Sequence, residues 1–256
     1  MSGVALAWHQ FRYDQLVFWR SPASVFFTVM LPLIFLFIFT GLFGDETIEE
    51  YGGIKVSTYY VPGIITLAVA SATLQSLAIN LTQARESGRL KRIRSTPLPA
   101  WAFVAGRVGN AFLISLLMTA LVTLIGNLLF GVAIPTRTIP ALLLTLVVGA
   151  FAFSCLGFAL TAAIPSEDAA PAIANVTLLP LYFLSGVFIP DNQIPDGVLS
   201  VADAFPIRHF FLAFFEGFDP NTTGAGFEWG HLAVLALWGV AGLVLAARFF
   251  SWAPRR

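Results

Sequence analysis

A cluster of basic residues between positions 83 and 100 is the segment of this chain best suited to bind a charged partner. Five cations fall within ten residues, and only Glu86 opposes them. The cations are Arg85, Arg89, Lys91, Arg92 and Arg94. At a membrane surface such side chains bind anionic lipid head groups, each contributing about 1 kcal/mol. We call residues 83–100 the basic island. Four of its residues recur at helical spacing and predict a short helix that ends before Pro97. They are Glu86, Arg89, Leu90 and Ile93.

Nucleotide and metal chemistry are not expected of this chain. A phosphate-binding loop requires the pattern G-x-x-x-x-G-K-[ST], but Lys55 and Lys91 are the only lysines and each follows an aliphatic residue. The histidines at positions 9, 209 and 231 are scattered without ligand spacing, so neither a metal site nor a cofactor is predicted. The single Cys155 lies in an apolar run and is expected to act as a small packing residue.

Composition and apolar runs predict an all-α integral membrane protein. The 256 residues are 57% hydrophobic and 11% charged, against roughly 25% charged in soluble domains, and the mean hydropathy is +0.82. Six continuous apolar runs approach the length of about 20 residues that a spanning helix needs. The runs are Val25–Phe43, Tyr59–Leu81, Ala102–Phe130, Ile139–Ile164, Ala170–Ile189 and Gly230–Phe250. Transmembrane strands would instead alternate over about ten residues.

The distribution of cations predicts which ends of the spans face the cytoplasm. Short loops rich in Lys and Arg stay on the cytoplasmic side, so the basic island places both termini inside a cell (inner or plasma) membrane. Eleven cations are then inside and three are outside. The inner ones are Arg12, Arg20, Arg85, Arg89, Lys91, Arg92, Arg94, Arg107, Arg248, Arg255 and Arg256. The outer ones are Lys55, Arg137 and Arg208.

Two flanking segments are expected to associate with the membrane without crossing it. Residues 1–22 are aromatic and mixed in polarity, with Trp8 on the apolar side of a helical wheel and Asp14 elsewhere, which fits a helix in the inner interface or a frayed tail with interfacial anchors. Residues 190–229 hold two short helical stretches broken by Pro and Gly, which predicts a re-entrant outer hairpin. Arg208 and Glu216, eight apart in the second stretch, are a candidate ion pair.

Polar side chains within the second and fifth runs are candidates to line a pathway. Such residues face protein or a water-filled cavity rather than lipid. The candidates are Ser71, Gln75, Asn80, Asn175, Tyr182 and Ser185. The alternative is that they form interhelical hydrogen bonds of about 0.6 kcal/mol each. Pro180 is expected to kink the fifth helix.

Two stretches resemble the permeases of type-2 ABC exporters. The first is ESGRLKRIRSTPLPAWAFVAGRV, which resembles the loop between the family's second and third spans at Glu86, Gly88, Leu90, Thr96, Pro97, Leu98, Pro99 and Gly106. The second is PLYFLSGVFIPDNQIPDGVLSVADAFPIRHFFLAF, which resembles the family's stretch after the fifth span at Pro180, Phe183, Ser185, Gly186, Pro190, Pro195, Pro206 and Arg208. Their order and spacing extend the resemblance over essentially the whole chain, as a single permease domain, 1–256.

The resemblance implies a half-channel that pairs with a second permease and with two ATP-binding subunits, which would hold ATP and Mg. In this family the loop at 83–101 carries a coupling helix, so its basic island is expected to dock the ATP-binding subunit. The next inner loop offers a weaker second contact. The expected coupling residues are Glu86, Arg89, Leu90, Arg92, Arg94, Glu167 and Asp168. Orientation and lipid binding alone are the alternative for the cations.

Three functions can be compared with the sequence: an exporter subunit, a membrane-embedded enzyme and a passive channel. An exporter subunit for amphipathic compounds such as drugs or lipids, or for lipid-linked polysaccharide, agrees with the resemblance; its partners would be proteins and lipid, not nucleic acid. A membrane-embedded lipid enzyme would need carboxylates, His or Lys within the spans, whose interiors hold none. A passive channel would leave the resemblance of the coupling loop unexplained. The substrate, and whether the second permease is identical, cannot be read from these residues.

Overall fold

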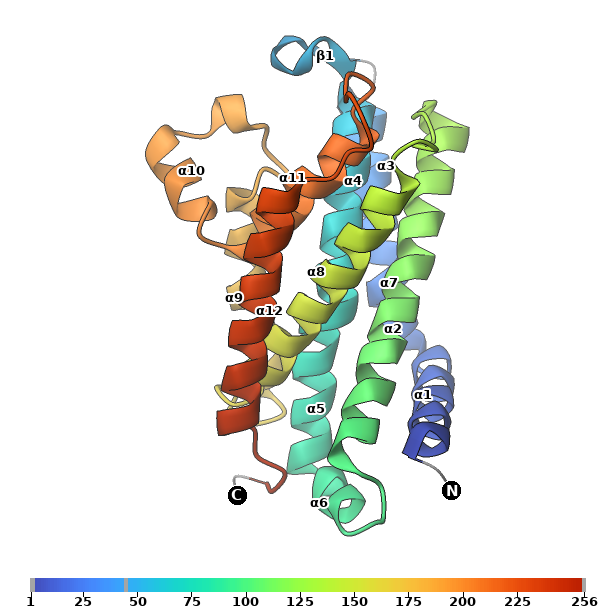
Figure 1. Ribbon diagram of the computed structural model, residues 1–256, viewed down its shortest axis with the longest axis vertical. Coiled ribbons are helices and arrows are strands. Elements are labelled where there is room, and N and C mark those ends of the chain that lie inside the picture. The colour runs from blue at the N-terminus through green and yellow to red at the C-terminus, as the bar shows by residue number, and fades with distance from the viewer. Residues whose placement is uncertain (1–2, 44–45, 255–256) are drawn as a thin grey trace.

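The computed structural model describes residues 3–43 and 46–254. Arg255 and Arg256, two of the cations expected on the inner side, lie outside the described residues. The protein is a bundle of long helices (Figure 1). The two ends of the chain and the short helix α6 lie at one end of this bundle, and β1 and the 219–228 loop lie at the other (Figure 1).

The described residues contain five helical stretches that are long and apolar enough to cross a membrane. Two of them join several segments through a π-helical turn. The first joins α2 (Pro22–Val25), η1 (Phe26–Met30) and α3 (Leu31–Phe43). The second joins α4 (Val56–Ala70), η3 (Ser71–Gln75) and α5 (Ser76–Glu86). The others are α7 (Ala100–Phe130), α8 (Ile139–Leu160) and α12 (Trp229–Phe249). These five agree with predicted runs, since apolar length is what lipid selects.

The fifth predicted run is shorter than expected. Helix α9 (Ala169–Leu184) has 16 residues and ends before the apolar residues 185–189, so the prediction of a helix through Ile189 is wrong. Gly186 adopts a positive φ of 83° there, a conformation that favours glycine and ends a helix. At 1.5 Å per residue α9 is shorter than the hydrocarbon layer. The helix continues through Pro180.

Two short helices follow α9, as the Pro and Gly pattern predicted. After the turn η4 (Asp191–Gln193) come α10 (Asp196–Ala202) and α11 (Pro206–Phe218), which meet at 97°. Counted together they would make a sixth apolar crossing. Helix α11 is nearly surrounded by protein, because its Phe210, Phe211 and Phe214 are fully buried against α4, α8 and α12.

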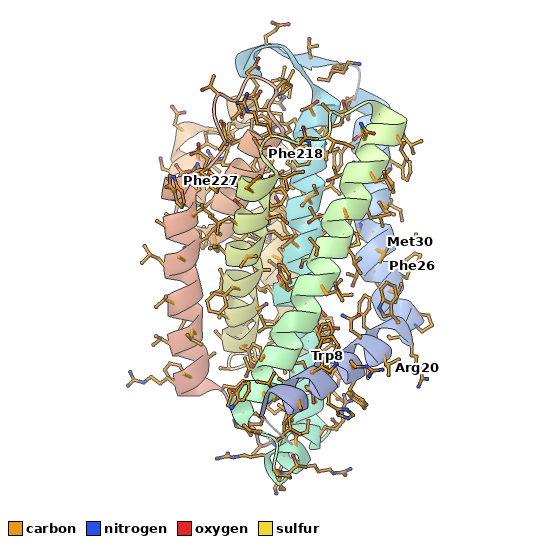
Figure 2. All side chains as sticks on the ribbon, turned by 45° about the vertical axis from the view of Figure 1, so that its right-hand side comes forward. Trp8, Arg20, Phe26, Met30, Phe218 and Phe227 are labelled. Atoms are coloured by element: carbon orange, nitrogen blue, oxygen red, sulfur yellow. The ribbon has the colours of Figure 1, made fainter. Side chains whose placement is uncertain are left out.

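The remaining elements are small and lie at the ends of the bundle. A two-residue hairpin of β1 (Thr47–Ile48) and β2 (Ile54–Lys55), joined by η2 (Glu49–Tyr51), links α3 to α4. Helix α6 (Arg89–Arg94) caps the opposite end, and α1 (Gly3–Trp19) packs against α7 beside it. Figure 2 shows α1, with Trp8 and Arg20, crossing the lower part of α7, far from Phe218 and Phe227.

Candidate translocation site and coupling loop

Polar side chains of the second span meet polar side chains of α9. The Nε2 atom of Gln75 donates to Oδ1 of Asn175 at 2.7 Å, and the hydroxyls of Ser71 and Tyr182 lie 3.3 Å apart. Ser71 and Gln75 are the first and last residues of η3. Single π turns within helices are rare and are frequent at functional sites. The turn therefore marks the level at which the second span meets α9.

A pocket of about 130 Å³ opens beside these four polar residues. Its remaining walls are apolar and come from α3, α4, α9 and Phe188. Drug-sized ligands occupy roughly 300–1,000 Å³, so this pocket is only part of a ligand site. Asn175 and its neighbours Val176 and Leu179 are exposed on α9, so the polar cluster borders an open surface of the chain.

Two of the predicted pathway residues do not join this cluster. The Nδ2 atom of Asn80 donates to Ser76 Oγ at 3.0 Å, one turn earlier in its own helix. Ser185 is buried, and its Oγ donates to the Tyr182 carbonyl at the end of α9. The structure thus brings together Ser71, Gln75, Asn175 and Tyr182, while Asn80 and Ser185 satisfy local backbone or side-chain groups.

The basic island has an exposed face and an anchored face. After α5 ends, Gly88 turns the chain with a φ of 73°, and α6 then presents Arg89, Arg92 and Arg94 to the exterior. Leu90 is 0% exposed, packed in an apolar cluster with Leu81 and Phe103. Leu90 therefore anchors α6 to the bundle, and any part it takes in coupling would come from this anchorage rather than from direct contact with a partner.

Arg85 connects the island to the next loop at the same end of the bundle. This side chain is only 1% exposed, so it differs from the exposed cations of the island. Its two terminal nitrogens donate to the carbonyl oxygens of Thr161 and Ile164, each at 2.7 Å, and Nε donates to Glu86 at 2.6 Å. Hydrogen bonds from a charged donor are stronger than neutral ones. Helical spacing from the buried Ala78 and Leu81 was the signal that could have placed Arg85 inward.

Glu167 and Asp168 are exposed just before α9. The residues that accept from Arg85 precede them in the same turn between α8 and α9. The two predicted coupling segments are therefore linked through a single buried guanidinium. Among the described residues, no three His, Cys, Asp or Glu side chains are grouped closely enough to hold a metal ion.

A profile of the family described as "ABC-2 type transporter" matches residues 4–218, most of the chain. The chain belongs to the ABC-2 type transporter family.

Several curated proteins of similar length align with this ABC-2 permease. It is 27% identical over 198 residues to the "Daunorubicin resistance ABC transporter permease protein DrrB1" of Streptomyces coeruleorubidus, covering 76% of this chain and 68% of that protein. It is 22% identical over 227 residues to the "Putative transport permease YvfS" of Bacillus subtilis, covering 89% of each. It is 26% identical over 194 residues to the "Inner membrane transport permease YadH" of Escherichia coli, covering 75% of each. Permeases of this family are multi-pass transport subunits without an ATP-binding cassette of their own.

In this ABC-2 permease α1 is held against α7 by polar contacts that the helical wheel did not predict. Asp14 is 3% exposed and lies 3.4 Å from Arg107, and Gln10 donates to it at 3.0 Å. Burial raises the pKa of Asp14, while the charge of Arg107 and the Gln10 hydrogen bond oppose the rise. Trp8 is exposed instead. The helix thus turns polar residues toward the protein and leaves an aromatic residue on its outer surface.

At the end of the bundle opposite α6, charged and polar side chains that are distant in sequence bind one another. Arg208 donates to both carboxylate oxygens of Asp191, at 2.8 and 2.9 Å, and to Asp203 at 2.6 Å. The expected pairing of Arg208 with Glu216 is wrong, because Asp191 and Asp203 flank it more closely. The Nδ1 atoms of His209 and His231 lie 2.7 Å apart, so histidines that are scattered in sequence meet where α11 packs on α12.

Proposed function

We propose that this chain is the membrane-spanning subunit of an ATP-driven exporter of hydrophobic or amphipathic compounds. It would act as one permease domain, pair with a second permease, and dock separate ATP-binding subunits that hold ATP and Mg. Both termini and α6 would face the cytoplasm, because the excess of Lys and Arg lies at that end. Helix α1 would lie in the inner interface, and α10 with α11 would form the outer re-entrant hairpin.

The observation that carries this proposal is that the basic island contains both exposed arginines and buried residues that anchor it. Three arginines of α6 are free to meet a partner, while Leu90 and Arg85 hold the same segment to the bundle. A purely lipid-binding patch needs charges but no such anchorage. Because Arg85 also holds the turn that carries Glu167 and Asp168, a force on α6 would reach two inner loops together.

The cargo class is supported by the polar pocket and by the relatives. The pocket combines neutral hydrogen-bonding groups with apolar walls and borders an exposed face of α9, which suits an amphipathic cargo completed by a second permease. One relative is named for daunorubicin resistance, and another is named a probable multidrug transporter permease. The direction of transport in the proposal follows from these names.

The test compares two triple variants that remove equal charge from the same end of the protein. One is Arg89→Ala, Arg92→Ala and Arg94→Ala on α6. The control is Arg12→Ala, Arg20→Ala and Arg248→Ala, which removes three other exposed cations. Each is co-expressed with the ATP-binding subunit that co-purifies with the unmodified permease, and the complex is assayed for subunit affinity and for ATP-driven uptake of a fluorescent amphipathic drug into inside-out vesicles.

The α6 variant is expected to bind the ATP-binding subunit at least about tenfold more weakly and to lose ATP-driven uptake. The control variant should keep both. Equal losses in the two variants would mean that only net charge at the membrane surface matters, and intact binding in the α6 variant would remove the docking assignment. If the unmodified complex moved no amphipathic drug, the proposed cargo class would be wrong.

A further inference from the structure

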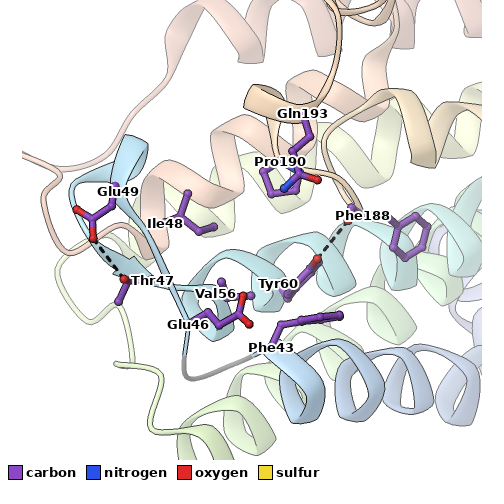
Figure 3. Close-up of a pocket in the computed structure, with 10 residues that line it drawn as sticks. All are labelled: Phe43, Glu46, Thr47, Ile48, Glu49, Val56, Tyr60, Phe188, Pro190 and Gln193. Carbon is purple, nitrogen blue, oxygen red and sulfur yellow. Dashed lines mark hydrogen bonds between the residues drawn. The ribbon is translucent and has the colours of Figure 1, made fainter.

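A second and larger pocket lies at the outer end of the chain. Its volume is about 380 Å³, which is within the range of small-molecule sites. It is enclosed by the end of α3, the β1–β2 hairpin, the start of α4 and the segment that follows α9 (Figure 3). These segments are far apart in sequence, so the pocket is a product of the tertiary fold.

The pocket combines an aromatic and aliphatic interior with carboxylates. Phe43, Tyr60 and Phe188 supply aromatic surface, and Figure 3 shows Glu46 beside Tyr60 and Phe43. Glu49 also borders it. None of the described residues that line this pocket is Lys, Arg or His. The pocket therefore offers two negative charges next to aromatic faces with no positive charge in its lining.

Neither carboxylate is neutralised by the part of the chain that the structure describes. Glu46 and Glu49 are exposed, and among the described residues neither forms an ion pair at the standard distance. Within the described part of the chain, Glu49 accepts one long hydrogen bond, 3.4 Å, from Thr47 Oγ1. A ligand cation would meet carboxylates and aromatic faces together, a combination that binds ammonium and other organic cations.

Phe188 separates this outer pocket from the polar pocket beside Gln75. It lines both. Its ring packs 5.4 Å from Phe39 and 5.2 Å from Phe183, and its carbonyl accepts from Tyr60 at 3.2 Å. The two pockets are therefore neighbours divided by one aromatic side chain. A molecule that occupies the inner pocket and the outer pocket in turn must have both apolar surface and a charge that the outer carboxylates accept.

We propose that the outer pocket binds an amphipathic organic cation, with its charged centre near Glu46 and Glu49 and its apolar groups against Phe43 and Phe188. The proposal deepens the proposed export function by giving the cargo a charge, and it rests on that function only for the source of the ligand. Anions are excluded by repulsion from the two carboxylates. Neutral amphiphiles are expected to bind more weakly, since they gain only the apolar contact.

Binding is measured on the purified full chain in nanodiscs, without an ATP-binding subunit. The probes are tetraphenylphosphonium and tetraphenylborate, ions of the same shape and opposite charge, each measured by equilibrium dialysis and corrected with empty nanodiscs. The test variant is Glu46→Gln with Glu49→Gln. The control is Asp196→Asn with Glu228→Gln, which removes the same charge from residues at the start of α10 and of α12 that do not line the pocket.

We expect the phosphonium to bind at least about tenfold more tightly than the borate, and the test variant to lose about tenfold in phosphonium affinity while the control keeps it. Equal affinity for the two ions, an unchanged test variant, or the same loss in the control would each overturn the proposal. Each single Glu→Gln variant should show part of the loss, which keeps the test valid if the double variant folds poorly. Because no ATP-binding subunit is present, a negative result here leaves the export test unaffected, and failure of the export test leaves this binding result standing.

Discussion

Replacing Gly157 with alanine tests how closely α8 approaches the π turn of the second span. A Cβ atom at Gly157 would lie 2.8 Å from the carbonyl oxygen of Leu74, 3.1 Å from its Cα and 3.1 Å from Leu77 Cβ. Two of these three contacts are with backbone, which cannot rotate away as a side-chain tip can. The variant must therefore push α8 and η3 apart.

The expected change in the free energy of unfolding is the sum of two opposing contributions. Overpacking of a tight site costs typically about 1–3 kcal/mol, and the backbone contacts place Gly157→Ala in the upper part of that range. Alanine gains about 0.5–1 kcal/mol over glycine within a helix. The free energy of unfolding should therefore fall by about 1–2 kcal/mol. For a chain of this size that corresponds to a Tm lower by about 2–8 °C.

Gly41→Ala is the matched control, because a Cβ there meets no atom within 4 Å. Its Tm should stay constant or rise by a few degrees, since only the helix-forming term acts. Both variants are heated in detergent, and the fraction that remains monodisperse is followed by size-exclusion chromatography. A Gly157→Ala protein that melts at or above the temperature of the unmodified chain would refute the close backbone approach.

Two further predictions concern the end of the bundle that holds α1 and α6. Arg85→Met should lower the free energy of unfolding by about 3–5 kcal/mol and reduce transport-coupled ATPase activity, because buried carbonyls lose a charged donor. Arg85→Lys should recover only part of the lost Tm, since one ammonium group cannot reproduce the two-pronged hydrogen bonding of the guanidinium. Gly106→Ala should loosen α1, because a Cβ would lie 3.1 Å from the Phe11 amide nitrogen and closer still to a side chain of α1. Trypsin should then cleave within α1 faster than it does in the control Gly109→Ala, where the nearest atom is 3.4 Å from the added Cβ. Equal cleavage of the two variants would contradict the contact.

The sequence predicted the long helices well, because a run of apolar residues reflects a requirement of the lipid rather than of the fold. For the same reason the predicted length of α9 was too great. Residues 185–189 are apolar apart from Ser185 and Gly186, but they leave the helix to place the Gly186 carbonyl at the Tyr59 hydroxyl and Phe188 between two pockets. Hydropathy cannot distinguish an apolar residue that faces lipid from one that faces protein.

The sequence indicated which polar residues make contacts more reliably than it indicated where their partners lie. Ser71 and Gln75 could be assigned to a shared face, and their partners on α9 were among the candidates. Asn80 does not join this cluster, because Ser76, four residues earlier, accepts its hydrogen bond locally. The burial of Asp14 was not predicted, since its partner Arg107 belongs to a distant helix. A helical wheel considers the polarity of each residue separately, whereas the burial of an ion pair depends on both of its members.

The same reasoning explains why the anchored half of the basic island matters for the proposed mechanism. A docking helix that rested on the membrane by charge alone could slide when a partner moved, and the second span would not follow. Leu90 and Arg85 remove that freedom, because displacement of α6 must either break a fully buried apolar contact or break charge-assisted hydrogen bonds to the α8–α9 turn. Motion of α6 is then passed to α5 and to the start of α9 together. Gln75, the last residue of η3 before α5, donates a hydrogen bond to Asn175 of α9, so such a motion would strain this polar contact of the candidate pathway.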